Sequence, residues 1–338
     1  MEQFPFKGRL LVCDMDGTLL NSSSKISEGN RKALERFVEG GGMFTVATGR
    51  MEKSVMPYLD MLPVNVPAIV YNGAAIYDFK ADRILWQADL DTSIAGAVRD
   101  VMERFPGISV QVYHGGRAYF VSENEHSDAH RIRENFEPVR TGLDEVPSPW
   151  FKIILAWDPS KLKDVEEFLR GYEAEFNGAD RENEDRGSED RGSEAKGSEA
   201  KGSEDRENED RGSEAKGGEA KGCRVKACDE AVHKTAGRKA PFRQVYSEPQ
   251  FLELMNPEAT KGSALKVLID MLGVDRSCVI SMGDNLNDIE LIKEAGTGIA
   301  VENAHSMLKA AACMCCTDHD SDAVSEVICW LEKGNILL

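Results

Sequence analysis

The chain has 338 residues, and 41 Lys and Arg against 59 Asp and Glu give it a formal net charge of −18 at pH 7. This excess of acid disfavours nucleic acid or an anionic membrane surface as a partner. No apolar run approaches the roughly 18 residues of a membrane-spanning helix. Domains commonly hold roughly 100–200 residues, so the length indicates two of them.

The cysteines and the first residues both favour a cytoplasmic protein. Eight cysteines are too few for a disulfide scaffold in a chain of this length. Most lie in apolar stretches, as Cys13 and Cys278 do, where thiols behave as small core residues. The first residues carry no basic segment followed by an apolar stretch and a cleavage site. We therefore expect a reduced, unexported protein.

Strand-like and helix-like segments alternate at both ends of the sequence. The short apolar run at 9–13 predicts a buried strand, and Ser27 is placed to cap a helix with Leu34 and Phe37 on its apolar face. Further strands are predicted at 43–47, 68–71, 278–281 and 298–301, and further helices at 262–272, from 286 and at 324–331. This alternation is typical of an α/β fold with a Rossmann-like, doubly wound parallel sheet.

The middle of the chain has a different pattern, which predicts a second domain inserted into the first. Two candidate hairpins are formed by 74–78 with 84–87 and by 109–113 with 118–122. A candidate strand lies at 151–157, and candidate helices lie at 94–105 and 161–175. This mixture is typical of an α+β domain. We expect a core domain at 1–83 and 250–338 and a cap domain at 84–249, the latter interrupted by a low-complexity insert at 177–240.

A five-residue repeat occupies 180–219, within this insert. Its eight copies carry a net charge of −7, which leaves −11 for the other 298 residues, and it contains no aromatic or β-branched residue. Such a tract buries too little apolar area to offset its ordering entropy. We expect a disordered segment, with a partner-binding or transiently helical segment as the alternative.

Two carboxylates directly after the first strand carry the strongest chemical signal. Asp14 and Asp16 stand two residues apart before Gly17, at the strand end where ligands bind in an open α/β sheet. Two such carboxylates can divide the work of a nucleophile and a proton carrier. The plainer interpretation is a strand that ends in an Asp-Gly turn.

Other polar segments are predicted at the same edge of the sheet. Thr48-Gly49-Arg50 follows the second strand, Lys261-Gly262 opens a helix, and the acids Asp284 and Asp288 follow a later strand. Clustered acids without His or Cys favour a hard cation such as Mg²⁺. A hydroxyl, a lysine and Mg²⁺ around a nucleophilic carboxylate make a phosphoryl-transfer site.

At these residues the chain closely resembles the haloacid dehalogenase (HAD) superfamily of phosphatases, whose four motifs appear in order. Tyr71-Asn72-Gly73-Ala74, the passage 252–262 and residues 298–304 are similar to its Cof-type branch, subfamily IIB. That branch carries an α/β cap between its second and third motifs. The resemblance covers nearly everything except about 177–240.

The resemblance implies a role for each matching residue. Asp14 would be the nucleophile that forms an aspartyl-phosphate, and Asp16 the general acid and base. Thr48 and Lys261 would contact the phosphoryl group and complete the catalytic set. Mg²⁺ would be held by Asp14, the Asp16 carbonyl and Asp284, with Asp288 in support. The implied substrate-binding positions are Thr48, Gly49, Arg50, Asn72, Gly73, Lys261 and Asn287. For Arg50 a structural salt bridge is the alternative, and Asn287 would orient Lys261 or the phosphate.

The insert is a departure from the family's pattern. About 65 residues separate the last cap helix from the segment before Lys261, so one cap strand is expected to be missing, displaced or supplied from 224–232. His114, His126 and His130 are cap candidates for substrate contact, although isolated histidines are more often structural. Cys223, Cys228 and His233 lack a zinc-site spacing. Cys313, Cys315 and Cys316 suit a buried edge strand.

The expected function is a cytoplasmic, Mg²⁺-dependent phosphatase of small phosphorylated metabolites, with a sugar phosphate first and pyridoxal phosphate or a nucleotide as further possibilities. The alternatives are a phosphomutase or a dedicated sucrose- or trehalose-type sugar-phosphate phosphatase with the same cap. A catalytically idle binding or regulatory protein that uses the charged repeat is a third. No oligomeric state is predicted.

Overall fold

A computed structural model of the chain describes residues 5–172 and 241–334. The five-residue repeat, the candidate strand at 224–232 and the Cys223, Cys228 and His233 group therefore lie outside the described residues. Within the described ranges, no helix has the length and apolar character needed to cross a membrane.

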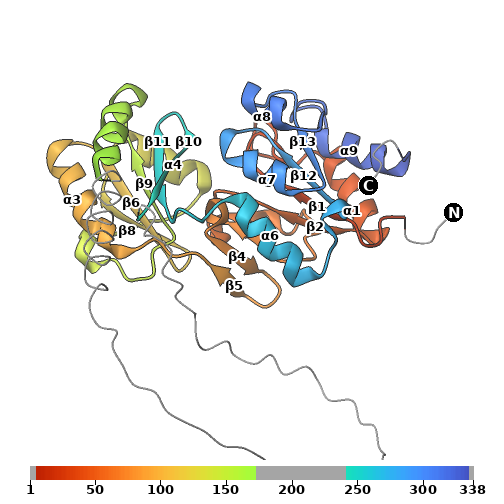
Figure 1. The fold of residues 1–338 in the computed structure, drawn as a ribbon, viewed down its shortest axis with the longest axis horizontal. Helices are drawn as coiled ribbons and strands as arrows, with labels where there is room; N and C mark the ends of the chain where they lie inside the picture. Colours follow the sequence, from red (N-terminus) through yellow and green to blue (C-terminus); the bar gives the residue numbers. More distant parts are fainter. Residues whose placement is uncertain (1–4, 173–240, 335–338) are drawn as a thin grey trace, which may run out of the picture. The chain divides into compact units, whose positions relative to one another are not determined.

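A five-stranded parallel sheet forms the core domain, with the strand order β14-β13-β12-β1-β2 (Figure 1). The strands are β1 (Leu10–Cys13), β2 (Met43–Val46), β12 (Val279–Gly283), β13 (Thr297–Ala300) and β14 (Met314–Cys315). The helices are α1 (Glu28–Glu39), α2 (Glu52–Val55), α6 (Lys261–Leu272), α7 (Ile289–Glu294), α8 (Ser306–Ala311) and α9 (Ala323–Glu332). The prediction of an α/β fold with a parallel sheet is confirmed.

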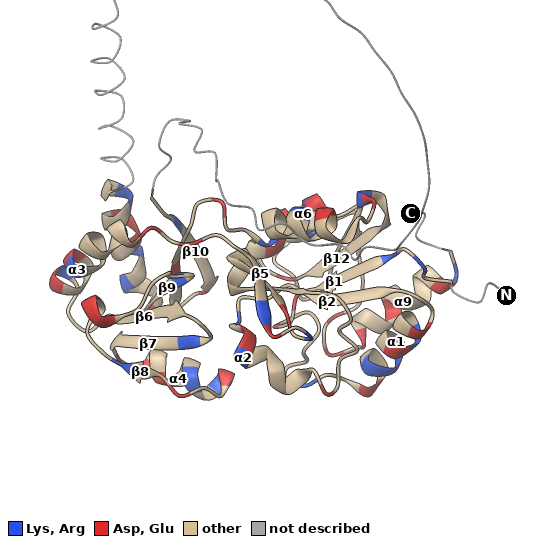
Figure 2. Ribbon diagram, turned by 90° about the horizontal axis from the view of Figure 1, so that it is seen from below, with Lys and Arg blue, Asp and Glu red and all other residues tan. Residues whose placement is uncertain are grey.

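The alternating side chains of β1 are buried on both faces of this sheet. Leu11 and Cys13 belong to the cluster that includes side chains of α1 and α9, whereas Leu10 and Val12 belong to the cluster that includes side chains of α6 and α7. Figure 2 shows α6 on one side of the strands and α1 with α9 on the other. A strand buried on both faces is continuously apolar, which explains the run at 9–13. The Ser27 side chain caps α1, as predicted, by accepting from the Asn30 N–H at 3.1 Å.

A small antiparallel sheet adjoins the core and corrects one expectation. It contains β3 (Ala68–Val70), β4 (Ala75–Asp78) and β5 (Arg83–Gln87) in that order. The predicted hairpin of β4 and β5 is present, but β3 is not a full strand of the parallel sheet. It pairs along its length with β4, and its backbone link to the parallel sheet is the bridge between Ile69 and Ala47, the residue after β2.

The cap domain is a six-stranded sheet in the order β10-β11-β9-β6-β7-β8, antiparallel except for its last pair. Its strands are β6 (Ser109–His114), β7 (Arg117–Ser122), β8 (Val139–Arg140), β9 (Lys152–Ala156), β10 (Arg243–Glu248) and β11 (Phe251–Met255). Its helices are α3 (Ala95–Arg104), α4 (Glu125–Glu134) and residues 159–172. The edge strand beside β11 is therefore supplied by 243–248, directly before the loop into β11.

The central cap strands are buried on both faces, and charged side chains occur among apolar ones on one of these faces. Ile153 and Leu155 of β9 and Leu252 and Leu254 of β11 belong to the cluster that includes α3 and the helix at 159–172. The residues between them, such as Glu253, therefore point to the opposite face, because strand side chains alternate.

The chain crosses between core and cap twice, and the two crossings lie side by side. The Asn256 side-chain amide of the second crossing donates to the Asp89 carbonyl of the first at 2.7 Å. The Leu90 N–H, next to Asp89, donates to the Trp150 carbonyl of the cap at 2.8 Å. Two strands fall beyond the predicted domain boundaries: β5 continues past residue 83 in the core hairpin, and β11 follows residue 250 yet belongs to the cap sheet.

The remaining short helices are 3-10 turns at Met56–Tyr58, Tyr71–Gly73, Thr92–Ile94, Leu143–Glu145, Arg276–Cys278 and Leu286–Asp288. At the far edge of the core sheet, β14 is the predicted edge strand. Cys316 is buried there, but Cys313 and Cys315 are exposed, so the expectation that all three pack in the core is wrong. An edge strand has a neighbour on one side only, which leaves alternate residues in solvent.

Candidate active site

The polar motifs meet at the carboxyl ends of adjacent parallel strands. Asp14 directly follows β1, Thr48 lies two residues beyond β2, and Asp284 directly follows β12. Because β1 lies between β2 and β12, these three segments become neighbours at one edge of the sheet. The structure thus brings the three predicted segments together at one sheet edge.

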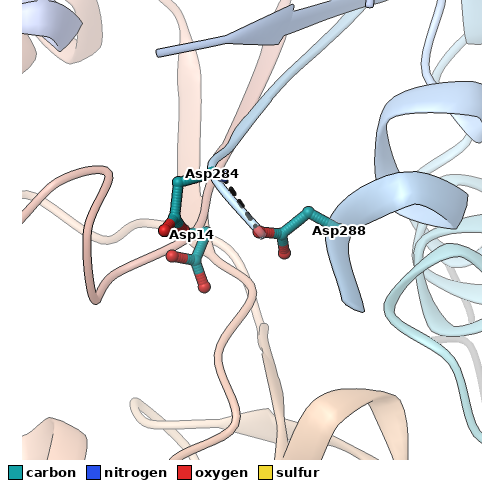
Figure 3. A group of neighbouring side chains, drawn as sticks. All are labelled: Asp14, Asp284 and Asp288. Atoms are coloured by element: carbon teal, nitrogen blue, oxygen red, sulfur yellow. Dashed lines mark hydrogen bonds between the residues drawn. The ribbon is translucent and has the colours of Figure 1, made fainter. Parts of the chain in front are cut away.

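Three carboxylates converge at the centre of this edge. Asp14, Asp284 and Asp288 each offer an oxygen within 4.8 Å of the others, as the close-up in Figure 3 illustrates. Asp288 is fully occupied by the protein, since its Oδ2 accepts from the backbone N–H groups of Asp284 and Asn285 at 3.1 Å each. Asp14 and Asp284 keep oxygens that no backbone group takes.

Lys261 enters the cluster from the first turn of α6. Thr260 caps this helix by accepting from the Ser263 N–H, which fixes the helix start. The Lys261 ammonium donates to Asp14 Oδ1 at 2.5 Å and to Asp288 Oδ1 at 2.6 Å, and its side chain is 1% exposed. Burial opposes the charge, but the two carboxylates raise the pKa of Lys261 above its ordinary value, so the ammonium is retained.

Negative charge exceeds positive charge in this cluster, which fits a divalent cation. Three carboxylates and one ammonium leave a net charge of −2. Burial raises the pKa of Asp14, and burial together with Asp288 raises the pKa of Asp284 to about 7. A hard dication stabilises such charge, and an all-oxygen donor set suits Mg²⁺. Asp14 and Asp284 have oxygens to offer it, whereas Asp288 is placed to orient Lys261 and the loop.

Asp16 is held by Arg50 in a two-bond ion pair. The guanidinium donates Nε to Asp16 Oδ2 at 2.7 Å and Nη2 to Oδ1 at 2.6 Å. The Arg50 side chain is 2% exposed, whereas that of Asp16 is 50% exposed and faces the cavity. Arg50 thus makes the salt bridge that sequence analysis weighed, and it lines the cavity as well.

The loop at Thr48 and Gly49 is fixed through its carbonyl groups. The Thr48 carbonyl accepts from the Asn72 N–H at 2.9 Å, and the Gly49 carbonyl accepts from the Lys152 ammonium of the cap at 2.9 Å. The Thr48 hydroxyl accepts from the Arg50 N–H at 3.1 Å. The cap therefore holds the loop that sequence analysis assigns to the phosphate.

Three successive residues with positive φ, Tyr71, Asn72 and Gly73, form a sharp turn beside this loop. The turn places the Asn72 side chain between the cap and the core, where it donates to Glu253 at 2.8 Å and accepts from Asn287 at 3.0 Å. Asn287 thus contacts Asn72, not Lys261. Gly73 does not line the cavity; a Cβ there would lie 2.1 Å from the Thr260 carbonyl oxygen, so Gly73 lets the turn pack against the start of α6.

A cavity of about 300 Å³ extends from Asp14 to the cap. Its core side is formed by Asp14, Asp16, Gly49, Arg50, Asn72, Asp284, Asn285 and Asn287. Its cap side is formed by His130, Arg133, Glu134, Lys152, Ser247, Glu248, Phe251 and Glu253. Of the three histidines considered from the sequence, His130 lines this cavity, and His114 and His126 do not.

Apart from His130, sequence reasoning missed the cap side of the cavity. Lys152 and Glu253 form an ion pair at 3.2 Å, with side chains 4% and 2% exposed. Their signal was a single charge inside an otherwise apolar strand, as in Leu252-Glu253-Leu254. A charged residue at such a position is buried only when it is paired.

Comparisons with known proteins agree with this architecture. A family model described as haloacid dehalogenase-like hydrolase matches residues 11–185 and 196–328. The 5-amino-6-(5-phospho-D-ribitylamino)uracil phosphatase YwtE of Bacillus subtilis is 25% identical over 326 residues, which cover 96% of this chain and 99% of that protein. The pyridoxal phosphate phosphatase YbhA of Escherichia coli is 23% identical, with 95% and 97% covered.

A solved structure shares the fold at low sequence identity. The HAD subclass IIB sugar phosphatase BT4131 superimposes with a TM-score of 0.67 at 16% identity, and the match covers 97% of this chain and 100% of that one. The family model spans most of the chain. The chain therefore belongs to the haloacid dehalogenase-like hydrolases, as its motifs predicted.

Proposed function

We propose that this protein is a Mg²⁺-dependent phosphatase that hydrolyses small phosphorylated metabolites through an aspartyl-phosphate. The observation that carries the proposal is the position of Asp14. Its carboxylate lies at the base of the cavity, at a strand end, with one oxygen bonded to Lys261 at 2.5 Å. This arrangement orients a carboxylate for attack in a site where positioning and charge neutralisation dominate the chemistry.

In the proposed reaction a carboxylate oxygen of Asp14 attacks phosphorus, and the bond from phosphorus to the leaving oxygen breaks. Asp16 gives its proton to that oxygen and then takes a proton from the water that attacks the aspartyl-phosphate, so inorganic phosphate leaves and both carboxyl groups are restored. Both oxygens of Asp16 accept from Arg50 in the structure, so this ion pair must open before Asp16 can carry a proton. Lys261 balances charge on Asp14 and on the phosphoryl group.

Asp14 and Asp284, with the Asp16 carbonyl, would hold Mg²⁺, which when bound supplies positive charge to the phosphoryl oxygens. Asp288 would act indirectly, because Lys261 and two backbone N–H groups already occupy its oxygens. Thr48 and Gly49 would bind the phosphoryl group from the second strand end.

The cavity supports a small substrate, with a sugar phosphate as our first choice. A volume of about 300 Å³ is at the lower end of the range for small-molecule sites. Two relatives are named for phosphomonoesters of modest size, a phosphorylated ribityl compound and pyridoxal phosphate.

The test is phosphate release from sugar phosphates, nucleotides and pyridoxal phosphate, with Mg²⁺ and with EDTA. We expect metal-dependent release by the wild-type protein and none by Asp14→Asn, which removes the nucleophile at nearly constant volume. A circular dichroism spectrum of the variant controls for folding. Wild-type turnover by Asp14→Asn would refute the assignment, and an isomer formed without free phosphate would identify a mutase instead.

A further inference from the structure

The cap side of the cavity carries two cations, and each already has a carboxylate of its own. Arg133 of α4 donates Nη1 to Glu248 at 2.7 Å and contacts the other oxygen of that carboxylate through Nη2. Lys152 donates to both oxygens of Glu253 at 3.2 Å and to the Gly49 carbonyl at 2.9 Å. Both positive charges are therefore already neutralised by the protein, without a substrate anion.

The cation on the core side is also paired, since Arg50 donates to both oxygens of Asp16. Every Arg and Lys that lines the cavity, within the parts of the chain that the structure describes, therefore has an acidic partner. A second anionic group on a substrate would have to displace one of these carboxylates. The displaced carboxylate would then remain near the incoming anion, which is unfavourable because like charges repel, most of all at the buried pair of Lys152 and Glu253.

Glu134 differs from the other cap carboxylates, because no Arg or Lys among the described residues pairs with it. Its Oε1 contacts Nε2 of His130 at 3.0 Å, and the described residues provide no hydrogen-bond partner for Oε2. The side chain lines the cavity and is 10% exposed. Although burial favours the neutral acid, His130 and the nearby cations lower the pKa of Glu134, so the group is a carboxylate at neutral pH. It offers a hydrogen-bond acceptor to whatever fills the cavity.

An aromatic ring adjoins this acceptor. The Phe251 ring lies against the His130 ring, with their centroids 4.8 Å apart, and the Arg133 guanidinium lies 5.7 Å from the centroid of Phe251. The wall opposite the phosphate site thus combines an apolar face with a carboxylate oxygen, which suits a leaving group that carries both carbon and hydrogen-bond donors.

We propose that the phosphate is the only anionic group of the substrate, and that its leaving group directs a hydroxyl or ammonium group to Glu134. This inference rests on the proposed phosphatase function and narrows it. It excludes sugar bisphosphates, nucleoside di- and triphosphates and phosphorylated carboxylic acids as good substrates. A carboxylate such as Glu134 accepts a hydrogen bond from a substrate donor, and it repels an analogue that carries an anionic acceptor at the same position.

The test uses phosphomonoesters that differ at one terminal carbon. Sorbitol 6-phosphate carries CH₂OH where 6-phosphogluconate carries a carboxylate and 1-amino-1-deoxysorbitol 6-phosphate carries an ammonium group. Glycerol 3-phosphate and 3-phosphoglycerate form a shorter pair. We measure kcat/KM by phosphate release in saturating Mg²⁺, and expect each carboxylate ester to be about tenfold or more poorer than its alcohol, with the ammonium ester at least equal to the alcohol.

The variant Glu134→Gln assigns the preference to one residue. It keeps the shape and removes the charge, so the ratio of kcat/KM between alcohol and carboxylate esters should fall toward one. Glu137→Gln is the matched control, because Glu137 is on the same segment, 87% exposed and outside the cavity lining. The control should keep the wild-type ratio.

Three results would overturn the reasoning in distinguishable ways. Equal kcat/KM for alcohol and carboxylate esters in the wild-type protein would overturn the charge inference and leave the phosphatase intact. A ratio that survives in folded Glu134→Gln would overturn the role of Glu134. The absence of phosphate release from every ester, with folded protein and Mg²⁺, would overturn the proposed function and this inference with it.

Discussion

The buried pair of Lys152 and Glu253 provides the sharpest test of how the cap is held on the core. In Lys152→Met the ammonium is lost, and the Gly49 carbonyl and a buried carboxylate lose its hydrogen bonds. Glu253 then keeps one hydrogen bond, from Asn72 at 2.8 Å. Removing one partner of a buried ion pair costs about 3–5 kcal/mol, because the remaining charge is uncompensated. We expect the free energy of unfolding to fall by about that amount.

The double variant separates the pair from general damage to packing. In Lys152→Met with Glu253→Gln no unpaired charge remains, and the amide oxygen still accepts from Asn72, so the loss should be smaller, about 1–3 kcal/mol. Equilibrium unfolding in urea measures both values, with Lys80→Met in the exposed turn after β4 as the control, expected within about 0.5 kcal/mol of wild type. Glu253→Gln alone is measured in the same way to complete the cycle. If the losses of Lys152→Met and Glu253→Gln simply add in the double variant, the side chains are not coupled and the argument fails.

Three further predictions concern the metal, the turn at Gly73 and acid stability. Asp284→Ala should raise the Mg²⁺ concentration for half-maximal activity about tenfold or more, because one of the proposed ligands is lost; an unchanged metal titration would place the ion elsewhere. Gly73→Ala should lower the unfolding free energy by about 2 kcal/mol or more, since φ is +94° and the added Cβ would meet the Thr260 carbonyl; an unchanged melting temperature would contradict this. The pKa of Glu134 in the folded protein lies below its ordinary 4.5, so its contribution to stability is present above that pH and is lost as the pH falls. The stability difference between wild type and Glu134→Gln, from urea midpoints at a series of pH values, should therefore shrink from about pH 5 downward, and a constant difference would refute the assignment.

The core and its motifs were predictable because their signals are local. The run at 10–13 is apolar because β1 is buried on both faces, and Ser27 marks the start of the helix that it caps. Asp14 and Asp284 could be brought together without knowing any side-chain contact. Residues that directly follow parallel strands must gather at one edge of the sheet.

The cap side of the cavity depends on partners that are distant in sequence. Lys152 and Glu253 are separated by 101 positions, and Arg133 lies 115 positions from Glu248. A local sequence pattern contains only one member of such a pair. The sequence alone therefore does not show whether the charged residue is paired in the interior or exposed to solvent. The helix α4 was missed for a related reason: its weakly apolar sequence gives little periodicity, although Asn124 and Ser127 form a capping box that marks its start.

The hydrogen bond between Asn256 and Asp89 has a mechanical consequence. Because the two crossings run side by side, the cap is attached along one line and not at two separate points. A rotation of the cap about this line need not stretch either crossing. It would move each cap residue in proportion to the distance of that residue from the line. The contacts that must break in such a rotation include the hydrogen bonds of Lys152 with Gly49 and of Glu253 with Asn72. The stacking of Tyr71 on Phe151 must break as well, so polar and apolar contacts together resist the admission of a substrate.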